Sequence, residues 1–251
     1  MTGLGAMPTR LVEMAVDAAD PSAQARFWAA ALGWEVTDDD PGEARIAPAG
    51  FDYPGPAALP VTFAAVPEPK TVKNRVHLDL ASVSADDQAG QVRRLKDLGA
   101  TDLDIGQGDV PWVVLADPEG NEFCVLEPRE VYRDTGPVAA VVVDSADPVA
   151  LARFWSEAAG WRVTESGLDF ASLRSPGGVG PYLEFLHVPD QKTAKNRVHL
   201  DVSPYPGDDQ LAEVKRLQDL GAGPADVGQH DVPWVVLADP EGNEFCVLTP
   251  R

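Results

Sequence analysis

The sequence predicts an α+β fold built from four modules, each running from a strand to a helix and then to about three strands. Two observations predict it: the chain repeats itself, and strand and helix signals occur in two rounds within each repeat. Residues 109–126 recur unchanged as 231–248, and residues 73–79 recur as 195–201, both at an offset of 122 residues. This period far exceeds the roughly 20 to 50 residues of solenoid repeats, so each copy should be a domain-sized unit.

The two copies are expected to form two domains joined by a short polar link. The expected boundaries are 10–129 for the first domain, 130–137 for the link and 138–251 for the second domain. The motifs near the start of each copy, before Lys73, are offset by 127 residues, so the first copy contains five more residues than the second before Lys73. We expect residues 38–60, rich in Pro, Gly and Ala, to be a loop in the first copy that is shortened in the second.

The first round of elements opens with a strand over residues 10–16. Asp20 is placed to cap the following helix and Pro21 to occupy its first position, while Gly33 is placed to end it. Short strands then fit residues 44–47 and 59–66.

The second round repeats this order. A strand is expected over residues 75–81, followed by a helix that Ser84 caps and Gly99 ends. Residues 117–121, with the sequence Asp-Pro-Glu-Gly-Asn, should form a turn between two further strands. We therefore expect strongly curved sheets with helices on one side.

Strand alternation separates polar from apolar side chains in the repeated motifs. In residues 75–80, Arg75, His77 and Asp79 share one face, and the apolar residues between them can pack under the helix. The same alternation puts Cys124 on the face opposite Phe123 and Val125. A histidine on a concave face is a candidate ligand, acid or base, although a hydrogen-bonded ladder that only supports the sheet is an equally open alternative.

Composition limits the partners and the compartment. Forty acidic and twenty basic residues give a net charge of −20, which repels phosphate backbones and anionic lipid head groups. We therefore expect no nucleic acid and no membrane as partners, and a cytoplasmic location. Cys124 and Cys246 occupy the same place in the two copies, so no disulfide between them is implied. A monomer and a homodimer are both compatible with the sequence.

The repeated phrases resemble a known family. Ala-Asp-Pro, Ala-Arg-Phe-Trp, Leu-Gly-Trp, Lys-Asn-Arg-Val-His-Leu-Asp and Asp-Pro-Glu-Gly-Asn-Glu-Phe-Cys-Val-Leu look like the glyoxalase-like branch of the vicinal oxygen chelate superfamily. The resemblance covers nearly the whole chain. It implies four βαβββ modules forming two curved-sheet glyoxalase-like domains, whose cups hold a small molecule and, in the enzymes of the family, a divalent metal.

The resemblance also carries the family's metal ligands onto this chain, position by position. The first copy offers Glu13, Thr62, His77 and Cys124, and the second offers Ala140, Glu184, His199 and Cys246. Alanine and threonine are not ordinary metal ligands, and the cysteines stand where the metal enzymes have glutamate. Neither copy retains the full quartet.

The expected function is therefore a metal-independent cup that binds a small apolar or planar molecule, for sequestration or for processing. His77 and His199 are the tentative acid or base groups. The expected ligand-binding residues are Glu13, Trp112, Cys124, Glu184, Trp234 and Cys246. For the cysteines and tryptophans, burial in the core is the competing explanation.

A second hypothesis is a lyase or isomerase of the glyoxalase type, with one divalent metal ion per domain. Its ligand sets would be Glu13, His77 and Cys124 in one domain and Glu184, His199 and Cys246 in the other. A third hypothesis is a structural or regulatory module whose cups have lost their use.

Overall fold

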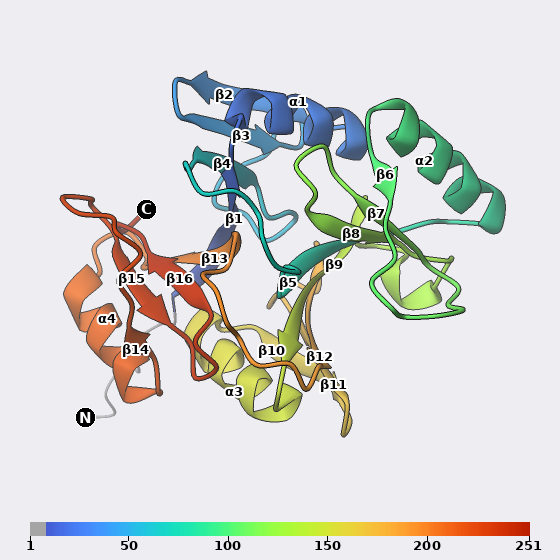
Figure 1. Cartoon of the computed structure of the whole chain (residues 1–251). Helices are drawn as coiled ribbons and strands as arrows, with labels where there is room; N and C mark the ends of the chain where they lie inside the picture. Colours follow the sequence, from blue (N-terminus) through green and yellow to red (C-terminus); the bar gives the residue numbers. More distant parts are fainter. Residues whose placement is uncertain (1–8) are drawn as a thin grey trace.

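The computed structural model describes residues 9–251, which form two eight-stranded sheets and four α-helices (Figure 1). The first copy contains module 1 and module 2. Module 1 consists of β1 (Arg10–Ala18), α1 (Pro21–Leu32), β2 (Glu35–Asp40), β3 (Glu43–Ala47) and β4 (Val61–Ala65). Module 2 consists of β5 (Val76–Leu80), α2 (Ala85–Asp97), β6 (Thr101–Asp102), β7 (Val113–Ala116) and β8 (Glu122–Val125).

The second copy follows a short 3-10 helix, η1 (Glu130–Tyr132). Module 3 consists of β9 (Val138–Ser145), α3 (Pro148–Ala159), β10 (Arg162–Ser166), β11 (Phe170–Arg174) and β12 (Tyr182–His187). Module 4 consists of β13 (Val198–Ser203), α4 (Gln210–Asp219), β14 (Gly223–Pro224), β15 (Val235–Ala238) and β16 (Glu244–Val247). The predicted α+β class with four βαβββ modules is confirmed.

Local signals end the helices where the sequence predicts. The Asp20 carboxylate accepts the Ala23 N–H at 2.9 Å at the start of α1, and Gly33 ends that helix with a left-handed φ of 68°. At α2 the Ser84 hydroxyl oxygen accepts the N–H of Asp87 at 3.1 Å. Among residues 9–251, no helix combines the length and the apolar character needed to cross a bilayer.

The short strand predicted over residues 44–47 is confirmed as β3, but residues 38–40, expected in a loop, belong to the strand β2. Residues 35–47 form the hairpin of β2 and β3, and the loop itself covers only 48–60. All six residues of β2 are exposed, so this strand has no apolar alternation to reveal it. The corresponding loop of the second copy, residues 175–181, is shorter, as expected.

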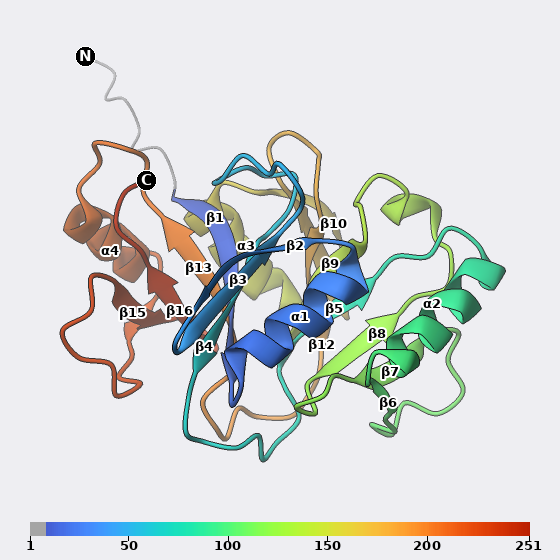
Figure 2. The ribbon, with the colours of Figure 1, turned by 90° about the horizontal axis from the view of Figure 1, so that it is seen from above.

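Each sheet is shared between the two copies of the repeat. Sheet A has the order β14-β15-β16-β13-β1-β4-β3-β2 and so joins module 4 to module 1. Sheet B has the order β10-β11-β12-β9-β5-β8-β7-β6 and joins module 3 to module 2. The joints are antiparallel, with β1 beside β13 and β5 beside β9 (Figure 2). The unit of sequence duplication is therefore not the unit of sheet formation.

Packing around the helices, in contrast, holds each copy together. The Trp28 ring of α1 lies 5.0 Å from the Phe123 ring of β8, and its indole N–H donates to Asp117 at 3.1 Å. Trp155 of α3 repeats this arrangement with Phe245 and Asp239. These aromatic residues belong to one continuous core that fills the space between the two sheets. The opposite face of each sheet is left free of helices, and that face carries the polar residues.

Candidate functional site

The helix-free faces gather polar side chains from two modules each. We call the helix-free face of sheet A cup A, and that of sheet B cup B. Matching strand positions contribute four residues to each cup: Glu13, Thr62, Asp201 and Cys246 in cup A, and Ala140, Glu184, Asp79 and Cys124 in cup B. The residues between them on the strands, such as Met14, Leu78 and Phe123, point into the main core. The predicted alternation is confirmed.

A buried aspartate beside a cysteine is common to both cups. Asp79 is level with Cys124 in the parallel pair of β5 and β8, and Asp201 is level with Cys246 in β13 and β16. Burial raises the pKa of Asp79 to about 7, and the neighbouring thiol opposes this only in part. Burial and the nearby Glu13 raise the pKa of Asp201 to about 7 as well. Each cup thus holds a carboxyl group that titrates near neutral pH.

The two thiols are kept in their neutral form. Burial raises the pKa of Cys124 and of Cys246 far above the ordinary value, and the adjacent aspartate raises each further. Among the described residues, the Oδ1 atoms of Asp79 and Asp201 have no hydrogen-bond partner. Such orphaned buried oxygens are costly unless the carboxyl group is protonated or meets a ligand.

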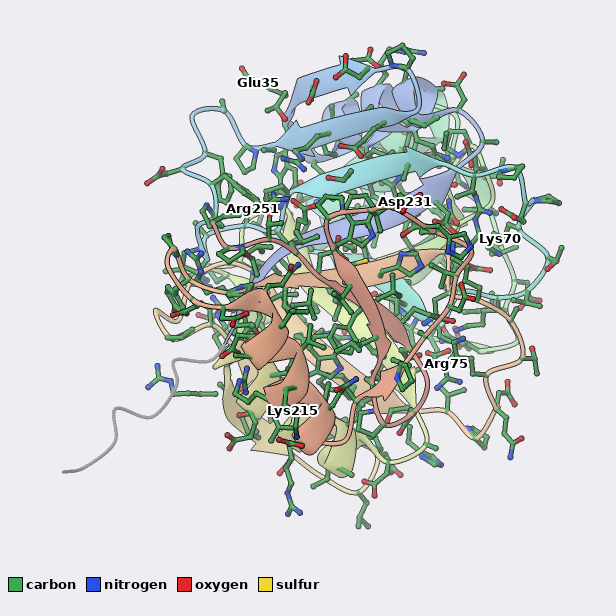
Figure 3. The ribbon with its side chains drawn as sticks, turned by 90° about the vertical axis from the view of Figure 1, so that its left-hand side faces the viewer. Glu35, Lys70, Arg75, Lys215, Asp231 and Arg251 are labelled. Atoms are coloured by element: carbon green, nitrogen blue, oxygen red, sulfur yellow. The ribbon has the colours of Figure 1, made fainter. Side chains whose placement is uncertain are left out.

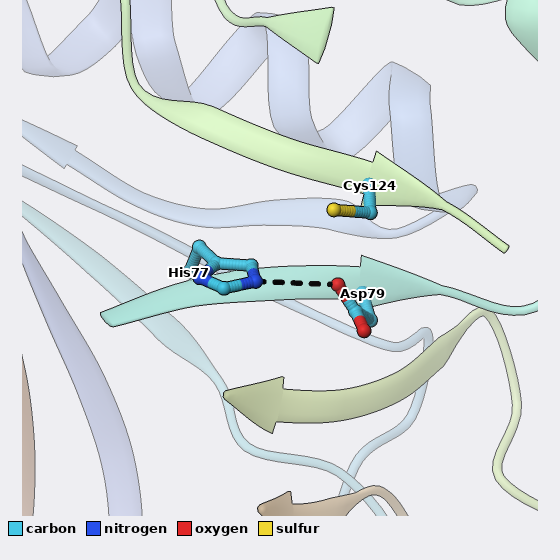
Figure 4. A group of neighbouring side chains, drawn as sticks. All are labelled: His77, Asp79 and Cys124. Carbon is cyan, nitrogen blue, oxygen red and sulfur yellow. Dashed lines mark ion pairs between the residues drawn. The ribbon is translucent and has the colours of Figure 1, made fainter. Parts of the chain in front are cut away.

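The two histidines lie on the same faces but are held neutral. His77 lies beside Asp79 on β5, with its Nε2 3.5 Å from Oδ1 of that aspartate, and the sulfur of Cys124 is close by (Figure 4). Burial lowers the pKa of His77 to about 3, and Lys73 adds to the effect. His199 is fixed by its Nε2 on the Asn196 carbonyl oxygen at 2.6 Å, and burial lowers its pKa too. An acid or base role for His77 and His199 stays a prediction, and burial favours the neutral form of both rings.

In cup A, cationic side chains surround the carboxylate of Glu13. Glu13 of β1 is 4% exposed and accepts the hydroxyl of Tyr53 at 2.9 Å. The guanidinium groups of Arg45 and Arg251 lie 3.3 and 3.8 Å from the same carboxylate oxygen. Figure 3 shows Arg251 beside the blue strands of module 1, although it belongs to the far end of the chain. Arg251 also donates to the Tyr53 hydroxyl at 2.7 Å.

In cup B, neutral hydroxyl groups donate hydrogen bonds to the carboxylate of Glu184. The Tyr132 hydroxyl donates to Glu184 of β12 at 3.0 Å, and the Ser172 hydroxyl donates to it at 3.1 Å. Burial raises the pKa of Glu184, whereas these hydrogen bonds lower it in part. The rings of Tyr132 and Tyr182 meet edge to face at 5.7 Å above the sheet.

Trp112, one of the two tryptophans predicted to bind a ligand, lies beside cup B. Trp112 packs against a small apolar cluster on the helix-free face, made of Cys124, Leu126, Tyr132 and Ala139. Its indole N–H donates to Gln107 at 2.8 Å, and Trp234 makes the same bond to Gln229 at 2.9 Å. Both indoles are partly exposed, so each presents one edge to the surface.

The structure does not bring together the residues of either predicted metal-ligand set. Glu13 lies in sheet A, whereas His77 and Cys124 lie in sheet B; conversely, Glu184 lies in sheet B with them. The cause is the exchange of modules between the copies, which pairs β1 with β13 rather than with β5. The sets Glu13, His77, Cys124 and Glu184, His199, Cys246 are therefore not brought together.

Several residues of the cups were missed by the sequence analysis. Asp79 was placed on the face of His77 but was given no role beyond a supporting ladder, and its counterpart Asp201 was not considered, although both share the repeated motif of the histidines. Tyr53 comes from the loop of the first copy and Tyr132 from the link, and neither lies in a repeated phrase. No local signal in the sequence points from these tyrosines to a glutamate on a distant strand.

The family's divalent metal can be tested against these donors. In cup A the residues do not fit it, because Arg45 and Arg251 already place positive charge at Glu13 and repel a second cation. In cup B the ligand atoms of His77, Asp79 and Cys124 lie within 4.8 Å of one another. This set offers three donors, but the thiol must lose its proton before it can coordinate, and burial opposes that loss.

A family profile described as the glyoxalase-like domain matches the sequence twice, over residues 13–126 and 140–248. The chain belongs to the glyoxalase-like domain family. The resemblance drawn from the repeated phrases is thereby confirmed.

Solved structures of the vicinal oxygen chelate superfamily share this fold. Glyoxalase I from Zea mays is 13% identical and superposes with a TM-score of 0.63, over 96% of this chain and 92% of that one. An unconfirmed dioxygenase from Bacillus subtilis is 17% identical and has the same TM-score, over 97% and 86% of the two chains. Among curated proteins, none matches the sequence. At these identities the likeness shows the fold alone.

Proposed function

We propose that this glyoxalase-like protein binds a small planar or largely apolar organic molecule in its cups without a metal ion. The observation that carries the proposal is the pairing of Glu13 with Arg45, Arg251 and Tyr53, which replaces the metal of the family with protein cations and a hydroxyl group. A binder of the sequestering kind needs a shaped face and a few polar anchors, and no bound ion.

Cup B supplies the better surface for a planar molecule. Trp112, Tyr132 and Tyr182 surround one side of the helix-free face, and flat rings of this kind stack on planar ligands. Glu184 and Asp79 provide polar anchors beside them, and both have a raised pKa. Asp79, with a pKa of about 7, is partly protonated at neutral pH and can donate as well as accept a hydrogen bond, which suits a ligand with a hydroxyl or carbonyl group.

Processing of the ligand, if it occurs, would use the aspartates. Asp79 and Asp201 have pKa values of about 7, the range in which a general acid or base works best at neutral pH, whereas His77 stays neutral. We therefore assign the acid–base role in this proposal to the aspartates, with the histidines beside them.

A metal-dependent lyase or isomerase is the second candidate function. It is favoured by one observation, the close approach of His77, Asp79 and Cys124 in cup B. An ion held by these three residues would stabilise negative charge on a developing enediolate.

Metal content separates the two candidates. The protein is purified without added metal, its metal content is measured by mass spectrometry before and after treatment with EDTA, and zinc and manganese are titrated calorimetrically. Our proposal expects less than 0.1 ion per chain, on the order of a trace, and no tight binding. Stoichiometric metal that is lost in His77→Ala would overturn it in favour of the second candidate.

A planar fluorescent probe, 7-hydroxycoumarin, tests the binding itself. We expect saturable binding that Trp112→Ala weakens about fivefold, since a lost stacking contact is worth about 1 kcal/mol. Trp234→Ala is the matched control, because it removes the equivalent ring near cup A. Recovery of the probe unchanged after incubation supports sequestration, and its conversion supports processing.

A further inference from the structure

We propose that an apolar cavity beneath residues 48–60 is a second small-molecule site, distinct from both cups, which takes a neutral apolar molecule. The cavity has a volume of about 440 Å³. Pockets of about 300 to 1,000 Å³ are the usual size for small organic ligands. The family profile and the similar structures assign nothing to this position.

The floor of the cavity lies between the two sheets, on the faces opposite the cups. Met14 and Val61 reach it from sheet A, and Leu78, Val138 and Val141 reach it from sheet B. All five side chains belong to the main core, so this end of the core is left incompletely filled. The site therefore shares no wall with Glu13, Glu184 or the two aspartates.

The roof of the cavity is the long loop between β3 and β4. Phe51, Ala57, Ala58 and Leu59 come from this loop, and Gly136 and Pro137 of the link close the other side. The equivalent loop of the second copy covers only residues 175–181. The roof thus depends on the five extra residues that distinguish the first copy.

The two copies also differ in the tryptophan that follows their first helix. Trp34 is only partly buried and lines the cavity, whereas its counterpart Trp161 is 4% exposed and fills the core. A large ring that forms a wall instead of filling the space leaves room for a ligand to stack on it.

The roof is held down by a close backbone contact with the second copy. Gly180 has a left-handed φ of 75°, and a Cβ atom at this residue would lie 2.2 Å from the carbonyl oxygen of Pro56 and 3.0 Å from Ala57. Only glycine permits this approach. The loop therefore rests on module 3, and the cavity below it belongs to the folded chain.

The lining selects the chemistry of the occupant. Asp52 is the one charged residue among the lining residues, and it is exposed at the edge. A cavity with apolar walls offers water few hydrogen bonds and favours apolar guests. A charged ligand would lose its hydration without compensation. Because the loop covers Leu78 and Val141, a protein partner could not reach the floor, and a small neutral molecule could.

The test uses the full chain and N-phenyl-1-naphthylamine, a neutral apolar dye that fluoresces on entering an apolar site. We expect one saturable dye site per chain that persists in Trp112→Ala, the variant in which the stacking surface of cup B is removed. Ala58→Phe fills the cavity from its roof and should weaken binding at least tenfold. Gly180→Ala lifts the roof at Pro56 and should weaken it by a similar factor, which provides a second variant should the first fail to fold.

Controls in the cups make the result specific. Tyr53→Phe changes a side chain of the same loop that faces cup A, and Trp112→Ala changes cup B. In both variants the affinity of the cavity for the dye should stay within twofold of the wild type, whatever happens to binding in the cups. The proposal is overturned if no saturable binding occurs, if Ala58→Phe and Gly180→Ala bind normally while folded by circular dichroism, or if Trp112→Ala abolishes binding.

Discussion

Cup A and cup B are built from equivalent strands, yet the glutamate that differs between them, Glu13 or Glu184, lies on a different strand in each. Glu13 lies on β1 in cup A, and the equivalent residue of β9 in cup B is Ala140. Glu184 lies on β12 in cup B, and the equivalent residue of β4 in cup A is Thr62. The residues on the neighbouring strand also differ between the two cups. Arg45 is opposite Thr62, whereas Ser172 is opposite Glu184.

The difference teaches that the repeated motifs kept the centre of each cup the same, whereas the glutamate and its partners differ between the cups. Both cups keep the buried aspartate beside a cysteine, within phrases that are unchanged in the repeat. The glutamate of cup A is held by an ion pair and that of cup B by hydroxyl groups. The two cups should therefore respond alike to changes in the aspartates and differently to changes in the glutamates.

The largest expected effect concerns the aspartates, and it tests what the cups share. Because the folded pKa of each, about 7, lies above the ordinary 3.8, the folded state binds the proton more tightly than the unfolded state. Their contribution to stability is thus full below about pH 4 and is lost as pH rises towards 7. Above pH 8 the loss is on the order of 4 kcal/mol for each carboxyl group, because each pKa unit is worth about 1.4 kcal/mol.

Asp79→Asn and Asp201→Asn imitate the protonated form. Each variant should therefore be more stable than the wild type at pH 8 and nearly equal to it at pH 4. Urea unfolding followed by circular dichroism at both pH values measures this. Equal gains in stability at pH 8 would confirm that the aspartate behaves alike in both cups. A loss of stability at pH 8 in either variant would refute a raised pKa for that aspartate.

The second prediction is meant to separate the cups. Glu13→Gln leaves Arg45 and Arg251 beside a neutral amide and should cost about 3 kcal/mol, the lower range for a broken buried ion pair. Glu184→Gln loses only hydrogen bonds to hydroxyl groups and should cost about 1 kcal/mol. Urea unfolding at pH 7 compares them, and the comparison fails if the two costs are equal.

The tyrosines refine the same contrast at a smaller scale. Tyr53→Phe removes the hydroxyl that donates to Glu13 and accepts from Arg251, so we expect a loss of about 1.5 kcal/mol. Tyr132→Phe keeps the ring in its apolar cluster and should cost about 1 kcal/mol. Thermal unfolding of the two variants is the measurement. A larger loss for Tyr132→Phe would reverse the order of the cups.

The smallest effect should be identical in both cups. Gln107 and Gln229 each accept an indole N–H at the surface, from Trp112 and Trp234. Replacing either glutamine with alanine should change stability by less than about 0.5 kcal/mol. Thermal unfolding should show equal shifts, and a clear difference would reveal a divergence of the rims that the hydrogen bonds do not show.

Much of the local structure could be predicted from particular residues. Asp20, Pro21 and Gly33 act within a few positions of themselves, so their effect on α1 is independent of the rest of the chain. The alternation around His77 and Cys124 likewise predicted which face they occupy. The strand β3 was predicted over residues 44–47, but its exposed partner β2 was missed, because β2 carries no apolar pattern.

The site was predicted only in part, since its residues meet through contacts distant in sequence. His77, Cys124 and Asp79 come together through neighbouring strands of one module. Tyr132 and Glu184 are 52 positions apart, and Arg251 is 198 positions from Tyr53. Such meetings depend on how modules pair.

The sequence by itself determined the modules, their number and the face on which each polar side chain lies, because capping, turn chemistry and strand alternation are local. Only the tertiary structure decided that module 1 pairs with module 4 and module 2 with module 3. The physical reason is the duplication. Strands β5 and β13 carry nearly the same residues, so hydrogen bonding along their edges does not distinguish one partner from the other. The pairing is settled by the packing of whole modules around the shared core.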